Sequence, residues 1–95
     1  DNMAFRCITV YTNNYEAFSD IYQEIESLSL AENEEREIEG ITVSDAGDVE
    51  EEYVNSMRAK PEVAVMKVKD KNITILQHGQ VFEVLFPSAQ EQATV

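Results

Sequence analysis

The sequence is poor in the residues that metal and nucleotide sites most often use. Cys7 is the single cysteine, which excludes an intrachain disulfide framework and a zinc site built from several cysteines of one chain. The three glycines are scattered, so there is no glycine-rich loop of the kind that holds phosphates. His78 is the only histidine, which limits acid–base chemistry near neutral pH.

Long apolar runs are also missing. No run approaches the roughly 20 residues that a membrane-spanning helix needs. The first residues lack the basic segment followed by an apolar one that marks a secretory signal. We therefore expect a cytoplasmic protein with no membrane partner.

Basic residues are scarce and unevenly placed. Seven lysines and arginines stand against 19 acidic residues, which gives a net charge of −12. Residues 1–57 hold 15 of the acids against only Arg6 and Arg36. Such a charge repels phosphate backbones and anionic lipid surfaces. We therefore expect no nucleic-acid partner, and the charge is compatible with a basic protein partner.

The densest run of β-forming residues is Val63–Phe86, which two turn signals divide into three strands. A two-residue turn at His78-Gly79 places Leu76 opposite Val81. If Val68 lies opposite Ile73, the intervening loop has two or four residues and no lysine enters the apolar face. That face is predicted to be buried, and it carries Ile73, Ile75, Phe82, Val84 and Phe86.

The N-terminal part predicts a strand and a helix. The strand, Phe5–Tyr11, has apolar residues at both odd and even positions, so both of its faces are apolar, as in strands in the interior of a sheet. Cys7 is interpreted as a small core residue of this strand. Helical spacing of apolar residues predicts a helix over 14–29, with Asn13 as its cap. The acidic segment 31–39 is compatible with a helical extension or a loop.

The middle of the chain predicts a further strand and helix. Ile38–Val43 has strand character, with Gly40 as a bulge or a point of close approach. A turn follows, and a short helix is then expected from Val49 to Ala59, capped by Asp48 and ended by Pro61.

These segments together predict a single α+β domain over residues 3–87, followed by a mobile polar tail over 88–95. The expected order is strand, helix, strand, helix and three strands. We expect a two-layer sandwich, with a mostly antiparallel sheet and both helices on one face. The order of the strands within the sheet stays open.

The second face of the predicted meander is half apolar and needs a cover. The cover could be a segment of the same chain, another subunit or a ligand. The leading hypothesis is a non-enzymatic protein that associates through this face, as a homodimer or with a basic or regulatory partner. The apolar half of the face contains Val63, Val65, Leu76 and Val81, and the polar half contains Lys67, Thr74 and Glu83.

Two other classes of function stay open. A small-molecule-binding domain or minor enzyme would hold its pocket between the first helix and the sheet. Its lining would come from Tyr15, Tyr22 or Tyr53, with His78 at the rim. An acidic nucleic-acid mimic would instead use the first half of the chain to capture a DNA-binding protein.

Clusters that could carry chemistry are weak. Asp45 and Asp48 offer oxygen ligands for a hard cation but lack the spacing of an EF-hand, and helix capping already accounts for Asp48. Cys7 and His78 have no third group to orient them. We therefore predict no catalytic residue, no metal site and no cofactor.

Overall fold

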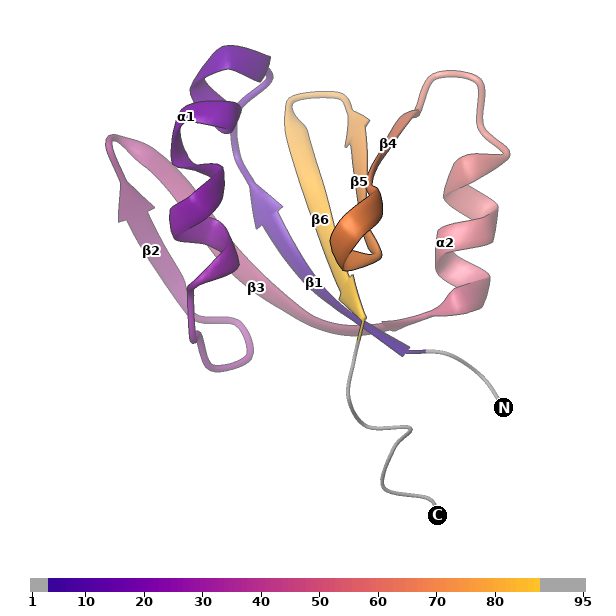
Figure 1. Ribbon diagram of the computed structural model, residues 1–95, viewed down its shortest axis with the longest axis horizontal. Helices are drawn as coiled ribbons and strands as arrows, with labels where there is room; N and C mark the ends of the chain where they lie inside the picture. The colour runs from indigo at the N-terminus through magenta and orange to yellow at the C-terminus, as the bar shows by residue number, and fades with distance from the viewer. Residues whose placement is uncertain (1–3, 88–95) are drawn as a thin grey trace.

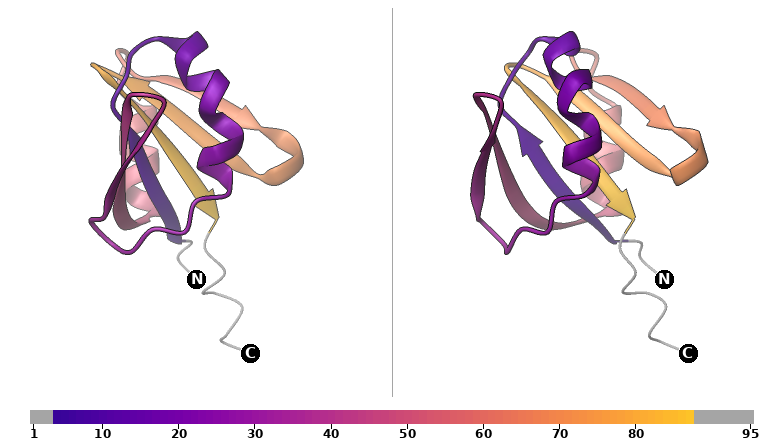
Figure 2. Two further views of the ribbon diagram at one scale, coloured as in Figure 1. Left: turned by 90° about the vertical axis from the view of Figure 1, so that its left-hand side faces the viewer. Right: turned by 60° about the vertical axis from the view of Figure 1, so that its left-hand side comes forward.

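The computed structural model describes residues 4–87, in which a six-stranded sheet lies between two helices (Figures 1 and 2). The predicted α+β class, the antiparallel sheet and the chain order are confirmed, with one strand added because the expected strand 38–43 is a hairpin. The predicted tail lies outside the described residues. The elements are β1 (Ala4–Val10), α1 (Tyr15–Glu26), β2 (Glu35–Ile38), β3 (Ile41–Glu50), α2 (Glu51–Arg58), β4 (Ala64–Val68), the 3₁₀ turn η1 (Lys69–Lys71), β5 (Ile73–His78) and β6 (Val81–Pro87).

The strand order is β2-β3-β1-β6-β5-β4, and every neighbouring pair is antiparallel. β1 lies in the interior, as its apolar residues on both parities predict. β2 and β4 form the two edges of the described sheet.

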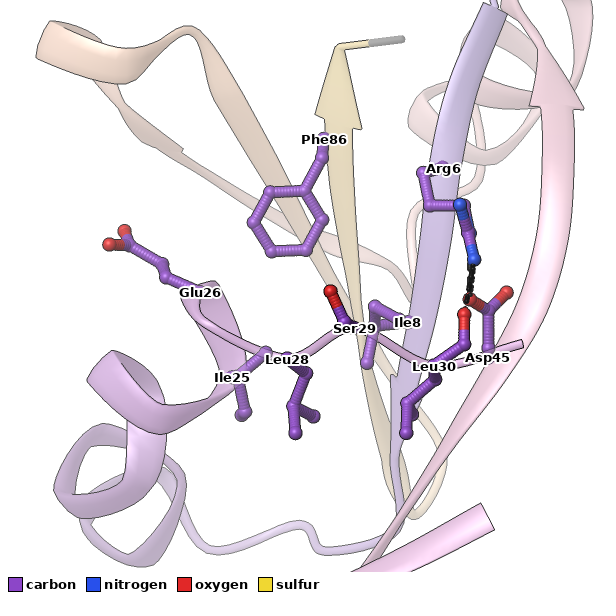
Figure 3. A pocket seen from close by; sticks show the side chains of 9 residues that line it. All are labelled: Arg6, Ile8, Ile25, Glu26, Leu28, Ser29, Leu30, Asp45 and Phe86. Carbon is purple, nitrogen blue, oxygen red and sulfur yellow. Dashed lines mark hydrogen bonds and ion pairs between the residues drawn. The ribbon is translucent and has the colours of Figure 1, made fainter. Parts of the chain in front are cut away.

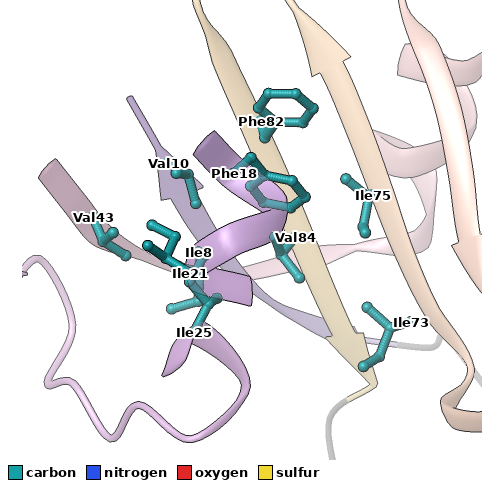
Figure 4. Packing of buried hydrophobic residues seen from close by; sticks show 10 residues of the cluster. All are labelled: Ile8, Val10, Phe18, Ile21, Ile25, Val43, Ile73, Ile75, Phe82 and Val84. Carbon is teal, nitrogen blue, oxygen red and sulfur yellow. The ribbon is translucent and has the colours of Figure 1, made fainter. Parts of the chain in front are cut away.

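Helix α1 begins where a side chain can satisfy its free backbone donors. The Asn14 side chain accepts a hydrogen bond from the Ala17 amide at 3.0 Å, so the cap is one residue later than the predicted Asn13. Phe18, Ile21 and Ile25 are buried against the sheet (Figure 4). The ring of Phe18 stacks on that of Phe82 with centroids 4.2 Å apart, which fixes α1 over β6.

The expected strand 38–43 is in fact the hairpin between β2 and β3. Glu39 and Gly40 form its turn, and both have positive φ, 51° and 83°. This is the backbone of a type I′ turn, which needs positive φ at both central residues. Gly40 therefore serves the turn and not a bulge, and the acidic segment before it ends in an edge strand.

The turn expected after Val43 is also strand. β3 continues to Glu50, but its register against β1 shifts, with Cys7 opposite Gly47 and Ile8 opposite Asp45. Ala46 is the extra residue of this bulge, and Gly47 supplies its positive φ of 85°. The extra residue reverses which face of the sheet the odd-numbered side chains of β3 point to. Val43, before the bulge, and Val49, after it, therefore pack in the cores on opposite faces.

Helix α2 follows β3 without a side-chain cap. Its first flanking residue, Glu50, makes no capping hydrogen bond, and Asp48 belongs to the strand, so the predicted Asp48 cap is wrong. Glu51 and Glu52 in the first turn and Arg58 in the last turn suit the helix dipole, which compensates for the missing cap.

The two helices cover opposite faces of the sheet, which corrects the expectation that both lie on one face (Figure 2). α1 packs on the face that carries Ile8, Ile75 and Val84. Val54 and Met57 of α2 pack on the other face, against Cys7, Leu76 and Leu85. The bulge in β3 allows α2 to lie on the second face, because the part of β3 that leads into α2 turns its apolar residues to that face.

The meander keeps its predicted faces with one change of register. Val68 lies opposite Ile73, as expected, and residues 69–72 make the four-residue loop. The second turn consists of Gly79 and Gln80, so the residue opposite Val81 is His78. The sequence had predicted Leu76 at that position. This shift of two residues leaves every side chain on its predicted face.

A pair of cross-strand neighbours tests this arrangement. We expect Leu76→Ala to lower the free energy of unfolding by about 2–5 kcal/mol, because Leu76 is fully buried. Val65→Ala, at the opposite position of β4 and 40% exposed, should change it by less than about 0.5 kcal/mol. Urea unfolding of both variants measures the difference. Equal effects would show that α2 does not cover the second face.

Candidate functional site

The sequence-predicted interaction face is largely covered by α2. Leu76 is fully buried and Val63 is 9% exposed, both in the core beneath α2. Thr74 is buried, and Val81 and Glu83 are partly buried. The chain itself therefore provides most of the cover, and Leu76 is not accessible to a partner in this arrangement.

Val65 and Lys67 differ from the rest of that face because they stay exposed. Both lie on β4, which has only β5 as a neighbour in the described sheet. Val65 is 40% exposed, and it is one of three large apolar residues that the described chain leaves exposed. Within residues 4–87 no strand pairs with the outer edge of β4, which therefore presents its backbone groups to a possible partner strand. We call Ala64–Val68 with this free side the β4 edge.

A groove runs beside the β4 edge on the face that carries α1. The β4–β5 hairpin projects beyond α1, so that the helix does not cover it (Figure 2). Met66 and Val68 point to this face and remain partly exposed. The resulting cavity of about 290 Å³, here called the α1–β4 groove, is lined by Tyr15, Phe18, Ser19, Tyr22, Gln23, Met66, Lys67, Val68 and Ile75.

Two of the four residues predicted to line a pocket meet in this groove. Tyr15 is 55% exposed at its mouth, and Tyr22 is partly buried in its wall. Burial and, after it, the nearby carboxylate of Glu26 raise the pKa of Tyr22. The Tyr22 hydroxyl itself is buried. The wall of the groove therefore offers a bound group the ring of Tyr22 and not its hydroxyl.

The other two, Tyr53 and His78, lie on the opposite face and meet at Glu83. The Tyr53 hydroxyl donates to Glu83 Oε1 at 2.7 Å, and His78 Nε2 is 3.4 Å from Glu83 Oε2. Burial and the hydrogen bond to Glu83 raise the pKa of Tyr53. The predicted four-residue pocket is therefore two separate places, and the second one fastens α2 to β6.

Cys7 lies in the core beneath α2 and is 2% exposed. Burial, and after it the charge of Glu83, raises the pKa of its thiol to about 12. A thiol that stays protonated and is shielded from solvent is a poor nucleophile. This agrees with its interpretation as a core residue.

A second cavity, of about 330 Å³, contains an ion pair (Figure 3). Asp45 has no solvent exposure, and one of its oxygens accepts a hydrogen bond from Arg6 Nε at 2.7 Å. Its other oxygen accepts the Gly47 amide at 2.6 Å, and Arg6 Nη2 donates to the Leu30 carbonyl at 2.6 Å. Both Asp45 oxygens are used, so this carboxylate is structural. Within residues 4–87 no group of three or more His, Cys, Asp or Glu residues is placed to hold a metal ion.

The charges of the two sheet edges are opposite. β2 presents exposed Glu35 and Glu37, and Arg36 on the same strand pairs with Glu34 at 3.2 Å. By contrast, five of the seven basic residues fall in residues 58–71, around β4, against two acids. Of these basic residues Arg58, Lys60, Lys67 and Lys71 are exposed. A nucleic-acid mimic would have to use the acidic side around β2, and this function stays a prediction.

Sequence reasoning named Tyr15 and Tyr22 for a pocket between the first helix and the sheet, but it did not name Met66, Lys67 and Val68 of β4 as lining residues. Tyr15, Ser19 and Tyr22 have the i, i+4, i+7 spacing that places residues on one helix face. The Arg6–Asp45 pair had no local signal, because 39 residues separate the two charges.

Searches with protein-family models, among curated proteins and among solved structures gave no match to this chain. Among the described residues no helix has the length and apolarity to cross a membrane. The function is therefore argued from the geometry.

Removing one half of the buried ion pair tests its structural role. Arg6→Met should lower the free energy of unfolding by about 2 kcal/mol, because it leaves the Asp45 carboxylate buried and unpaired. Solvent around the 42% exposed Arg6 side chain moderates the loss. Arg36→Met, the control, removes a solvent-exposed pair and should cost less than about 0.5 kcal/mol. Urea unfolding compares the two, and an Arg6 effect as small as that of Arg36 would contradict the role.

Tyr53→Phe tests the contact between α2 and Glu83. At neutral pH the variant should lose about 1 kcal/mol of unfolding free energy, since a hydroxyl that donates to a carboxylate is removed. The raised pKa of Tyr53 favours its neutral form in the folded state, so this stabilisation is present below the unfolded pKa of about 10. Above that pH the unfolded tyrosine ionises first, and the difference between parent and variant should shrink. A difference that grows from pH 8 to pH 11 in urea unfolding would refute the assignment.

Proposed function

We propose that the protein acts by association and not by catalysis, and that its partner docks as an added strand on the β4 edge. The observation that carries the proposal is Val65, an apolar side chain 40% exposed on an edge strand beside the α1–β4 groove. The hypothesis of association is kept from the sequence. Of the predicted face around Val65, Leu76 and Val81 the proposal keeps Val65 on β4 and leaves out Leu76, which is buried.

The β4 edge has the two features that strand addition uses. Its outer backbone groups offer the hydrogen bonds that give affinity, and a pocket beside the edge strand can take alternate side chains of the partner. Met66 and Val68 turn towards the groove, so a partner strand beside β4 would place every second side chain there. Val65 and Lys67 would meet the remaining side chains on the other face.

A small apolar molecule in the α1–β4 groove is the second candidate. The convergence of Tyr15 and Tyr22 on a cavity of about 290 Å³ favours it, since tyrosines combine an apolar ring with a polar tip. Such a ligand would contact the groove but not the β4 edge. Binding that survives Val65→Asp and is lost in Tyr22→Ala would support this candidate over strand addition.

The test combines light scattering with selection from a displayed library of random linear peptides. We expect the protein to bind itself or a subset of peptides, and Val65→Asp to weaken this binding at least tenfold, roughly, because a charge on an edge strand opposes strand addition. Tyr11→Asp is the matched control, since Tyr11 is 49% exposed and lies outside β4 and the groove. Its binding should equal that of the parent.

Circular dichroism and urea unfolding would establish that both variants are folded. Binding that is equally strong in the parent and in Val65→Asp would refute docking at the β4 edge. A parent that binds neither itself nor any peptide would refute association by strand addition.

A further inference from the structure

We infer that the strand received at the β4 edge is an acidic, extended peptide segment with apolar side chains at every second position. This inference rests on the proposed function and adds the chemical class of the partner. It is carried by the charge around β4 and by the division of the β4 side chains between two faces.

The charge around β4 is opposite to that of the chain as a whole. The net charge is −12, yet residues 58–71 carry five basic residues against two acidic ones. Lys67 lies on β4 itself and is exposed, and its side chain lies on the face opposite the groove. Lys71 follows in the η1 turn and is 57% exposed, although its ammonium also contacts Glu26 at 3.0 Å. A segment with acidic residues is attracted here and repelled by the glutamates elsewhere on the surface.

The acids of α1 do not cancel this attraction within the groove. The α1 residues that line it are Tyr15, Phe18, Ser19, Tyr22 and Gln23, none of which is charged. The lining of the groove therefore contains no acidic residue, and Lys67 borders it from β4 with its side chain on the opposite face.

The two faces of β4 select different side chains of the partner. On the groove face, Met66 and Val68 offer apolar contacts, and the tyrosines form the opposite wall. On the other face a partner residue opposite Lys67 gains from a negative charge, as cross-strand pairs of opposite charge do. The pattern that fits is apolar residues in alternate positions, with an acidic residue between two of them.

A second copy of this chain fits the edge less well. Antiparallel pairing of two β4 strands would bring two copies of Lys67, and the basic residues that flank it, towards one another. Like charges that meet across strands are destabilising. The partner is therefore a different segment, and self-association is the alternative that the experiment separates.

The experiment measures the composition of the peptides that the random library yields and how tightly they bind. We expect enriched peptides to carry an excess of Asp and Glu, with apolar residues at alternate positions. Lys67→Glu should weaken their binding roughly tenfold, because it replaces an attraction with a repulsion. The matched control is Arg36→Glu, which makes the same change of charge on the opposite edge strand and should leave the affinity unchanged. Rising salt should weaken binding to the parent.

The outcomes separate this inference from the proposed function. Two results would overturn the inference that the partner is acidic and leave docking at the β4 edge intact. In the first, the enriched peptides depend on Val65 but show no excess of Asp and Glu. In the second, they bind Lys67→Glu as tightly as the parent. A parent dimer that Val65→Asp dissociates, with no enriched peptide, would identify a second copy as the partner and also overturn it. Binding indifferent to both Val65→Asp and Lys67→Glu would overturn both proposals.

Discussion

The arrangement of this fold depends on one buried charge. Asp45 is a carboxylate without solvent exposure, and it must be neutralised and hydrogen-bonded where it lies. Arg6 on β1 supplies the charge, and the Gly47 amide satisfies the other oxygen. The backbone of Asp45 also holds the segment before β2, because its carbonyl accepts from Asn33 and its amide donates to Glu34. A single residue thus joins the bulge of β3, the central strand and the connection that leaves α1.

That bulge explains how a chain of this size covers a sheet on both sides. Before it, Val43 faces α1, and after it, Val49 faces α2, so one long strand contributes to two cores. A side chain added at Gly47 would lie 2.7 Å from a carboxylate oxygen of Glu32, and the positive φ there is strained for other residues. The position therefore serves both the turn of the backbone and the packing of the acidic segment.

The sequence predicted what local patterns determine and missed what distant contacts determine. The helices, β1 and the faces of the meander follow from apolar spacing, and their positions hold to within a few residues. The β2–β3 hairpin was missed because its turn, Glu39-Gly40, has only one residue that favours positive φ. Placing α2 required the bulge at Ala46, and Asp45 beside that bulge pairs with Arg6, which is 39 residues away in the sequence. The groove could be anticipated only in part, because Met66 and Tyr22 become neighbours through the sheet order alone.

The short, charged strand at the β2 edge limits how far any assembly can grow. A sheet with two receptive edges can add strands from both sides without end, which is the route to fibres. Here β2 is a strand of four residues with exposed Glu35 and Glu37, and short charged edges resist pairing. Growth through β4 alone ends after one addition. If β4 receives a partner strand as proposed, we therefore expect complexes that are small and of defined size.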